Sequence, residues 1–304
     1  MQTFVRVVET GSFSAVAREA NSAQSGISKQ VAALERELGA RLLFRTTRSL
    51  ALTEEGERYF EQVHRLVAEI TEAESVLRRG EQALSGWLRV AASVGYGRLK
   101  LLPLVRTFLA AHPGVKVDLK LNDGFVDLTE QGIDIAVRIG ELADSSLIAR
   151  RVGSTSRSLF ASRAYIRSLP KGKKLPRVPE DLLHHNCIVY TELSTQNAWT
   201  FTAGPGAAVE VGTAVTVRAQ GSLLTNSSEV VRAAVLSGMG IGYSPNWLFE
   251  DQMGTGDLQT LLPDWPATPL PVHLVSPAQR RNSAKVKAFA EHVLASESKG
   301  SPKV

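Results

Sequence analysis

The chain has 304 residues, 43% of them hydrophobic and 21% charged, which is enough for two domains with sizeable cores. The net charge of +5 permits nucleic-acid binding without requiring it. The single cysteine, Cys187, excludes an internal disulfide, and no apolar run resembles a secretory signal or a membrane span, so we expect a cytoplasmic protein without membrane contact.

Two helices joined by a short polar turn are predicted for residues 12–44. Small residues at Ala15–Ala17 allow the first helix to pack closely, and Asn21-Ser22 ends it, with Ser22 expected as the N-cap of the second helix. Apolar residues of the second helix recur at i, i+4, i+7 and i+11, which predicts one buried stripe: Ile27, Val31, Leu34 and Leu38.

Polar side chains lie off this stripe near the start of the second helix: Gln24, Ser25, Ser28, Lys29 and Gln30. A helix-turn-helix places its DNA-reading residues there, because the recognition helix enters the major groove with its N-terminus first. An ordinary helical hairpin with a polar face fits the same pattern, and the pattern alone does not separate the two.

Residues 41–60 extend the pattern and favour the first interpretation. With them the chain resembles the N-terminal domain of LysR-type transcriptional regulators. The matching residues are Gly11-Ser12-Phe13, Ala17, Gln24-Ser25, Ile27-Ser28-Lys29-Gln30, Leu34-Glu35, Leu38-Gly39, Leu42, Phe44-Arg45, Leu52-Thr53 and Gly56. The resemblance continues more weakly from residue 86 to about residue 295. Family members usually carry several residues before the equivalent of Met1, so we expect the first helix to begin early or translation to start upstream.

A hairpin tip is predicted between the apolar residues 42–44 and 50–52. It offers Arg45, Thr47 and Arg48, which suit phosphates or the narrow minor groove, where the electrostatic potential favours arginine. A solvated turn is the alternative. Together these elements predict a winged helix-turn-helix DNA-binding domain in residues 1–56.

Residues 57–86 are predicted to form a linker helix, with Thr53 as a cap just before it. Residues 1–52 hold seven Lys and Arg against four Asp and Glu, whereas residues 53–86 hold four against eight. Spacings of three and four predict a coiled-coil seam, interrupted at Glu74 and made of Phe60, Val63, Val67, Ile70 and Leu77. A second copy of the helix is the expected partner, and packing on the helix's own domain is the alternative.

An α/β domain is predicted for residues 87–295, followed by a disordered polar tail at 296–304. Strands are expected at 87–94, 115–121, 134–139, 159–161, 187–190, 214–218, 242–244 and 272–275, with helices around 101–109, 127–131, 165, 228–236 and 284–294. This order predicts parallel sheets with right-handed crossovers, in lobe I (about 87–155 and 262–295) and lobe II (about 156–261). The fold class is therefore α+β multidomain, and the bilobed part resembles periplasmic solute-binding proteins.

Ligands of open α/β sheets bind at the carboxyl ends of strands, next to helix N-termini. Candidate effector-binding residues at these ends are Ser93, Val94, Gly95, Asn122, Arg138, Thr191, Thr225, Asn226 and Ser244. They point to a small polar or anionic effector held between the lobes, with Ser93 and Thr225 facing each other. Each of these residues could instead be an ordinary strand-end turn residue.

Enzyme-like features are weak. Gly238–Gly242 is glycine-rich but follows a helix and precedes a strand, the reverse of a dinucleotide fingerprint. His184, His185 and Cys187 lack a second ligand cluster, and no nucleophile elbow is present. We therefore expect no enzyme activity, no metal and no cofactor.

The resemblance implies a transcriptional regulator that binds double-stranded DNA at an interrupted inverted-repeat operator. It further implies a homodimer or homotetramer, control by a small-molecule effector, and contact with RNA polymerase if the protein is an activator. A solute-binding or enzymatic module with a vestigial helix-turn-helix head is the alternative. The effector, the operator and the sign of regulation do not follow from the residues.

Overall fold

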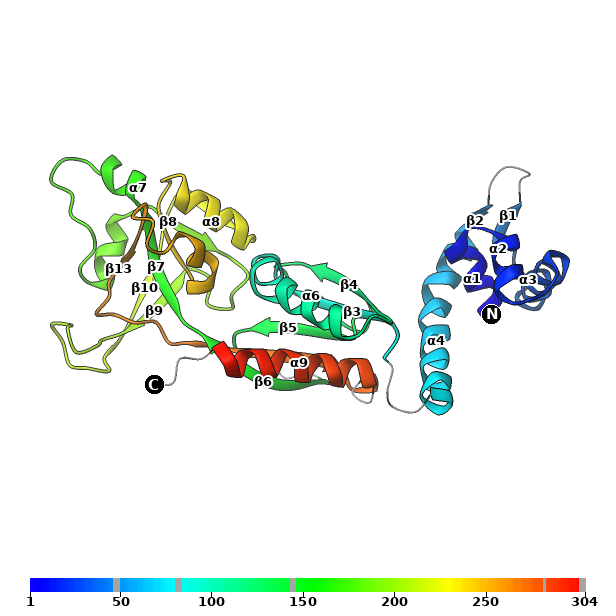
Figure 1. Cartoon of the computed structure of the whole chain (residues 1–304). Helices are drawn as coiled ribbons and strands as arrows, with labels where there is room; N and C mark the ends of the chain where they lie inside the picture. Colours follow the sequence, from blue (N-terminus) through cyan, green and yellow to red (C-terminus); the bar gives the residue numbers. More distant parts are fainter. Residues whose placement is uncertain (46–49, 80–83, 143–145, 281–282, 301–304) are drawn as a thin grey trace. The chain divides into compact units, whose positions relative to one another are not determined.

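A computed structural model describes residues 1–45, 50–79, 84–142, 146–280 and 283–300 (Figure 1). The chain divides into two compact units, Met1–Trp87 and Leu88–Val304, and each is considered separately. In the part of the chain that the structure describes, no helix is long and apolar enough to cross a membrane.

The first unit is a helix-turn-helix followed by a hairpin and a long helix. Ser12 caps the second helix by accepting a hydrogen bond from the Ala15 N–H, and Asn21, with φ of 50°, turns the chain after it. The N-cap of the third helix is Ala23, one residue later than Ser22. The elements are α1 (Gln2–Thr10), α2 (Phe13–Glu19), α3 (Gln24–Leu38), β1 (Leu43–Arg45), β2 (Leu50–Leu52) and α4 (Glu54–Arg79).

One apolar cluster holds this unit together. Ile27, Val31 and Leu34 of α3 are buried in it, as the stripe predicts, but Leu38 is exposed. The Glu35 carboxylate accepts the backbone N–H groups of Leu42 (3.0 Å) and Leu43. This contact attaches the start of the hairpin to α3, so the hairpin and the recognition helix are positioned together.

Helix α4 uses part of its predicted seam inside its own unit. Val63 and Val67 are buried in the cluster with α1, and the Phe60 ring lies 6.3 Å from the Phe4 ring. Leu66 and Ile70, which lie next to these valines on the helix surface, are about half exposed. The predicted seam was therefore wrong in its first half, because a seam residue that packs on α1 is not available to a second copy.

The second unit contains two five-stranded sheets, each the centre of one lobe (Figure 1). Lobe I has the strand order β4-β3-β5-β14-β6, and lobe II has the order β11-β8-β12-β7-β13. The chain passes between the sheets from β6 to β7 and again from β13 to β14. The strands of lobe I are β3 (Gly86–Ala92), β4 (Val115–Leu121), β5 (Ile135–Ile139), β6 (Leu147–Thr155) and β14 (Leu270–Pro277). Those of lobe II are β7 (Arg157–Ser162), β8 (Cys187–Tyr190), β11 (Leu223–Thr225), β12 (Ile241–Pro245) and β13 (Leu258–Leu261).

Helices cover these sheets. In lobe I, α6 and α9 pack through Phe108 and Phe289, whose rings lie 5.1 Å apart. In lobe II, β7 alternates, so Leu159 faces one apolar cluster and Phe160 faces another against α8. The helices are α5 (Val94–Tyr96), the π-helix η1 (Gly97–Leu101), α6 (Leu102–Ala111), α7 (Arg163–Ser168), η2 (Pro179–His184), α8 (Ser228–Leu236), η3 (Asn246–Gln252), η4 (Ala278–Arg280) and α9 (Ala284–Gly300).

The sheets are mixed rather than parallel. β3 and β5 pair in parallel, as do β11, β8 and β12, but β14 is antiparallel to β5 and β6. β7 is likewise antiparallel to β12 and β13. The antiparallel pairs named here each involve β7 or β14, which follow the two crossings between lobes, so strand direction there depends on the route between lobes.

Several local predictions also need correction. Residues 127–131 form a single turn, in which the Asp127 carboxylate accepts the N–H of Thr129, and Gly132 with φ of 62° ends it. The strand Ala214–Arg218 (β10) pairs only with β9 (Ala198–Thr202), outside the main sheet. Helix α9 continues to Gly300, where a disordered tail was expected from residue 296.

Gly56 provides a test of the first unit. The Thr53 hydroxyl accepts its N–H at 2.9 Å at the start of α4, and a Cβ at Gly56 would collide with the Leu42 carbonyl oxygen. Because the obstacle is backbone, Gly56→Ala should lower the free energy of unfolding of this unit by about 1–3 kcal/mol. Scanning calorimetry of the full chain measures it, with the neighbouring exposed Glu57→Ala as control. Equal melting of both variants would contradict this packing.

Candidate DNA-binding face and effector cleft

The polar face of α3 is exposed as the pattern predicts. Gln24, Ser25, Lys29 and Gln30 are exposed, and Ser28 is half-buried. Gln30 also accepts a hydrogen bond from the Thr3 hydroxyl at 2.6 Å, so its amide oxygen is partly committed to α1. Since no side chain among the described residues caps the start of α3, the first backbone N–H groups remain available to a phosphate.

The hairpin tip lies mostly outside the described residues. Leu43 pairs with Leu52 and Arg45 with Leu50, which places Arg45 at the last pair before the tip. Thr47 and Arg48 fall within 46–49, outside the part that the structure describes. The described geometry therefore supports a short hairpin after α3 and locates its basic end.

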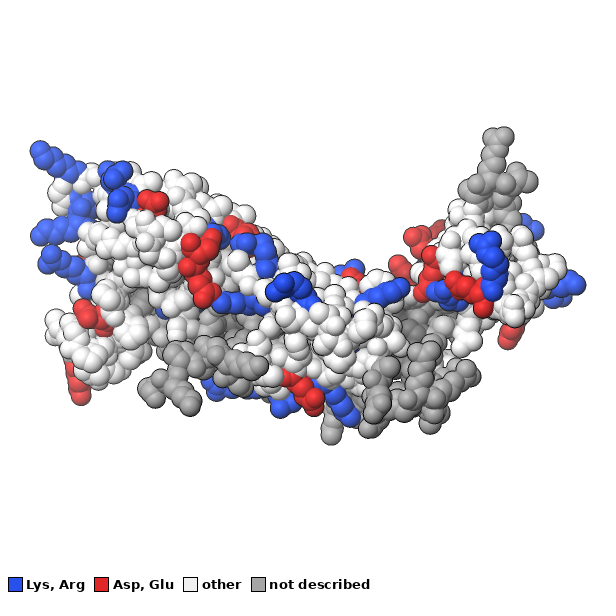
Figure 2. All heavy atoms as spheres, in the orientation of Figure 1, with Lys and Arg blue, Asp and Glu red and all other residues white. Residues whose placement is uncertain are grey.

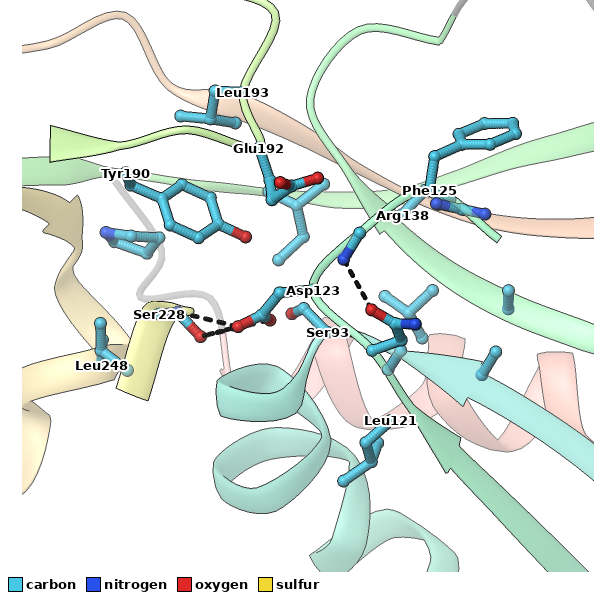
Figure 3. Close-up of a pocket in the computed structure, with 18 of the residues that line it drawn as sticks. Ser93, Leu121, Asp123, Phe125, Arg138, Tyr190, Glu192, Leu193, Ser228 and Leu248 are labelled. Atoms are coloured by element: carbon cyan, nitrogen blue, oxygen red, sulfur yellow. Dashed lines mark hydrogen bonds between the residues drawn. The ribbon is translucent and has the colours of Figure 1, made fainter. Parts of the chain in front are cut away.

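The second unit contains a cavity of about 360 Å³ between its two sheets (Figure 3). Four of the nine candidate effector residues line it: Ser93, Asn122, Arg138 and Ser244. Val94, Gly95, Thr191, Thr225 and Asn226 do not. Ser228, three residues after Thr225, supplies the hydroxyl that faces lobe I.

Asp123 joins the two lobes at this cavity. Its carboxylate accepts the N–H of Val94 (2.9 Å) in lobe I and the N–H of Ser228 (2.8 Å) at the start of α8 in lobe II. The Ser228 hydroxyl donates to the same carboxylate at 3.1 Å. A negative charge at helix starts is favourable, so the protein's own carboxylate occupies a position suited to a ligand anion.

Two ion pairs accompany this contact. Arg98 of η1 pairs with Glu229 of α8 at 3.1 Å, and Lys100 of η1 pairs with Glu250 of η3. A Cβ on Gly95 would lie 3.0 Å from the Ser228 hydroxyl oxygen, so the backbone of α5 approaches α8 closely. The two lobes are therefore held together along one line of polar contacts.

Two arginines also line the cavity. The Arg138 guanidinium lies 4.7 Å from the ring centre of Phe125, and the Arg157 guanidinium lies 4.5 Å from that of Tyr243. Burial lowers the pKa of both groups. No described carboxylate forms an ion pair with either, and Arg157 Nε is buried without a described hydrogen-bond partner. Arg138 Nη2 already donates to the Val126 carbonyl at 2.7 Å, and a ligand with negative charge or strong acceptors would bind the remaining donors of both arginines.

Tyr190 and Glu192 complete the cavity from lobe II. In Figure 3 both side chains point toward the space beside Asp123 and Ser93. Burial, then the charges of Asp123 and Glu192, raise the pKa of Tyr190, so its hydroxyl stays protonated and can donate. Neither Asp123 nor Ser228 is among the nine candidate effector residues, although Asp123 directly follows Asn122 at a predicted strand end and Ser228 begins the predicted helix 228–236.

The histidine and cysteine cluster is structural. Cys187 is fully buried, and burial raises the pKa of its thiol to about 12. His185 Nδ1 and the Tyr165 hydroxyl are hydrogen-bonded at 3.0 Å, while His184 is exposed. These contacts hold η2 and α7 against β8, as expected for residues of the core.

Comparison with known proteins identifies the family. A model described as bacterial regulatory helix-turn-helix protein, lysR family, matches residues 1–57, and one described as LysR substrate binding domain matches residues 81–297. The chain belongs to the LysR family of transcriptional regulators. Like the family, it combines a DNA-binding helix-turn-helix with an effector-binding domain, so the predicted resemblance, fold class and general function are confirmed.

Individual LysR-type regulators are similar over most of their length. The regulator CrgA of Neisseria meningitidis serogroup C is 34% identical over 86% of this chain and 84% of its own. The solved structure of CrgA from Neisseria meningitidis has a TM-score of 0.61 at 31% identity and covers 97% of both chains. The full-length Vibrio cholerae virulence activator AphB has a TM-score of 0.58 at 27% identity, covering 96% of this chain and 97% of that one.

Removal of the Asp123 carboxylate tests the contact between lobes. Asp123→Ala leaves two backbone N–H groups at helix starts without this acceptor, so the free energy of unfolding should fall by about 1–3 kcal/mol. Urea denaturation followed by tryptophan fluorescence measures it, since three of the four tryptophans lie in the second unit. Glu130→Ala, which removes an exposed carboxylate from the same lobe, is the control and should be neutral. Equal effects of the two variants would argue against an Asp123 link.

Proposed function

We propose that the protein recognises an inverted-repeat operator through α3 of two paired copies. The observation that carries this is the exposed polar start of α3 on a helix whose opposite face is buried. Gln24 and Ser25 would enter the major groove, and Ser28, Lys29 and Gln30 would bind bases or phosphates one turn further on. Arg45, Thr47 and Arg48 of the hairpin would contact the backbone or the minor groove.

Pairing of the DNA-binding units is assigned to two exposed apolar residues of α4. Leu66 and Ile70 are separated by one helical turn and expose about half of their surface, which is costly in water. A second copy of the helix would cover both. This yields a homodimer, or a homotetramer if the effector-binding domains also associate, and two-fold symmetry matches an inverted repeat.

The cavity between the lobes would bind a small polar or anionic effector. Support comes from Arg138 and Arg157, two half-buried cations that no described carboxylate pairs with. Ser93, Asn122 and Ser244 would add polar contacts. Val94, Gly95, Thr191, Thr225 and Asn226 would serve by shaping the strand ends and the start of α8, since they lie outside the cavity lining.

Effector control would act through the balance between lobe arrangements. A ligand shifts such a balance only by its difference in affinity for the two arrangements. Asp123, Arg98 and Lys100 already hold the lobes together, so an effector that adds contacts to both lobes would stabilise this arrangement further. The change would be transmitted to the paired DNA-binding units and, in an activator, to RNA polymerase.

The cavity is proposed as a binding site and not a catalytic one. The curated relatives are named transcriptional regulators. A regulator of this kind acts where the DNA is, so we assign it to the cytoplasm.

Gel-shift titration with the intergenic DNA upstream of the gene tests the proposed DNA contacts. Gln24→Ala should weaken operator binding by about 1–3 kcal/mol and relax sequence preference if Gln24 reads a base edge. Lys29→Ala should weaken binding to every sequence and lower the slope of affinity against salt by about 1. The exposed Glu37→Ala, at the far end of α3, is the control. Unchanged affinity in both test variants would refute the assignment.

Substitutions in α4 separate pairing from folding. Leu66→Glu with Ile70→Glu should leave a folded monomer that binds the operator poorly, because like charges would face each other across the helix pair. Val67→Asp should instead unfold the first unit, since Val67 is buried beside α1. Light scattering and circular dichroism distinguish the two outcomes. A wild-type oligomer from the double variant would place the pairing surface elsewhere.

A further inference from the structure

The positive charge of the chain is concentrated in one stretch of lobe II. Residues 87–304 contain 24 Lys and Arg against 18 Asp and Glu, whereas residues 1–86 contain 11 against 12. Residues 163–177 contain six Lys and Arg and no acidic residue, so the rest of 87–304 is balanced at 18 against 18. The basic character of the protein therefore depends on this stretch and not on the DNA-binding unit.

All six side chains are exposed and form what we call the basic surface: Arg163, Arg167, Lys171, Lys173, Lys174 and Arg177. Figure 2 shows Lys and Arg side chains gathered at the end of the second unit that carries α7. No carboxylate of the described residues forms an ion pair with any of the six. The carboxylate of nearby Asp181 instead accepts the backbone N–H groups of Arg177 (2.8 Å) and Val178.

The stretch is anchored and not a free loop. Ile166, Leu169 and Leu175 pack against the buried cluster of lobe II, which leaves the charged residues between them facing outward. The Lys173 N–H donates to the Pro170 carbonyl at 2.9 Å across a turn in which Gly172 has φ of 92°. The turn therefore keeps Lys171, Lys173 and Lys174 next to one another in an anchored part of the chain, where their like charges repel.

The uncompensated charge affects a neighbouring residue. Burial, and after it the positive charge of Lys173, lowers the pKa of His185. The acidic residues nearest in sequence, Glu180 and Asp181, follow the stretch, and Asp181 is engaged with backbone as described. The field of the surface is thus available to an external anion.

We propose that the basic surface is a second phosphate-binding site, which contacts the backbone of duplex DNA. The inference rests on DNA binding by this LysR-type regulator but not on which α3 residues read bases. Duplex DNA presents a negative charge about every 1.7 Å along its axis, so it can pair with each cation of an anchored basic surface. An acidic protein fits less well, because protein interfaces centre on apolar and aromatic anchors and are depleted in lysine. The apolar residues of this stretch point into the core.

Salt dependence of DNA binding by the full chain tests the proposal. Fluorescence anisotropy with a random-sequence duplex and with the upstream intergenic DNA gives the slope of log affinity against log salt. Each phosphate contact contributes about 0.9 to this slope. Lys171→Gln with Lys173→Gln and Lys174→Gln should therefore lower the slope by roughly 2 to 3 on both duplexes.

A matched control has the same loss of charge elsewhere on the second unit. Arg106, Lys116 and Lys287 are exposed in lobe I, and replacing all three with Gln removes the same net charge. Its slope should equal that of the wild type. If both variants keep the wild-type slope, or if both lower it by the same amount, the proposal is overturned. If the basic-surface variant keeps the wild-type slope but no longer binds RNA polymerase, the surface belongs to a protein partner and the proposal is also overturned.

Different outcomes would refute DNA binding by the protein and DNA contact by the basic surface. Absence of DNA binding by the wild-type chain would count against the regulatory function itself. The wild-type chain could instead bind DNA normally, with a salt slope that Lys29→Ala lowers and the triple substitution leaves unchanged. That result would count against the basic surface alone. Thermal melting of the triple variant checks that it is folded. The double variant Arg163→Gln with Arg167→Gln, on α7, is an independent second test, and its slope should fall by roughly 2.

Discussion

The arrangement of the effector-binding domain depends on one carboxylate placed at the start of two helices. Asp123 accepts the N–H groups of Val94 and Ser228, which belong to different lobes, and no ligand is needed for this contact. Helix starts favour negative charge, so this position stabilises the charged carboxylate and the contact between the lobes. The position at these two helix starts is therefore already occupied by the protein's own carboxylate.

The lining of the cavity carries charges of both signs. Asp123 and Glu192 line it together with two arginines that stack on aromatic rings. A guanidinium group that stacks on a ring loses hydrating water, and the ring offsets only part of that free-energy cost. Its N–H donors therefore remain able to bind an acceptor. The cavity volume and this polarity suit a small molecule with an apolar body and an acidic or strongly accepting end.

Helix α4 serves two purposes through neighbouring apolar residues. Val63 and Val67 complete the core of the DNA-binding unit, and Leu66 and Ile70 remain for a partner. A single helix that stabilises the recognition unit and also pairs it would couple the spacing of two α3 helices to the packing of α1.

The charge of the protein is unevenly distributed between its two units. The basic surface lies on lobe II, and the first unit is close to neutral.

The sequence by itself determined the buried and polar faces of α3, through the stripe of Ile27, Val31 and Leu34, and the resemblance of residues 11–56 to LysR-type regulators identified the helix-turn-helix. It also located most strands of the two lobes, since a strand that is buried on both faces is apolar throughout, as Cys187–Tyr190 is. Tertiary structure alone decided strand direction at β7 and β14, the burial of Val67 and the role of Asp123. Spacing along a chain shows which side chains share a face, but not which neighbour covers that face. A carboxylate that bridges residues 94 and 228 depends on contacts far apart in sequence, which no local pattern records.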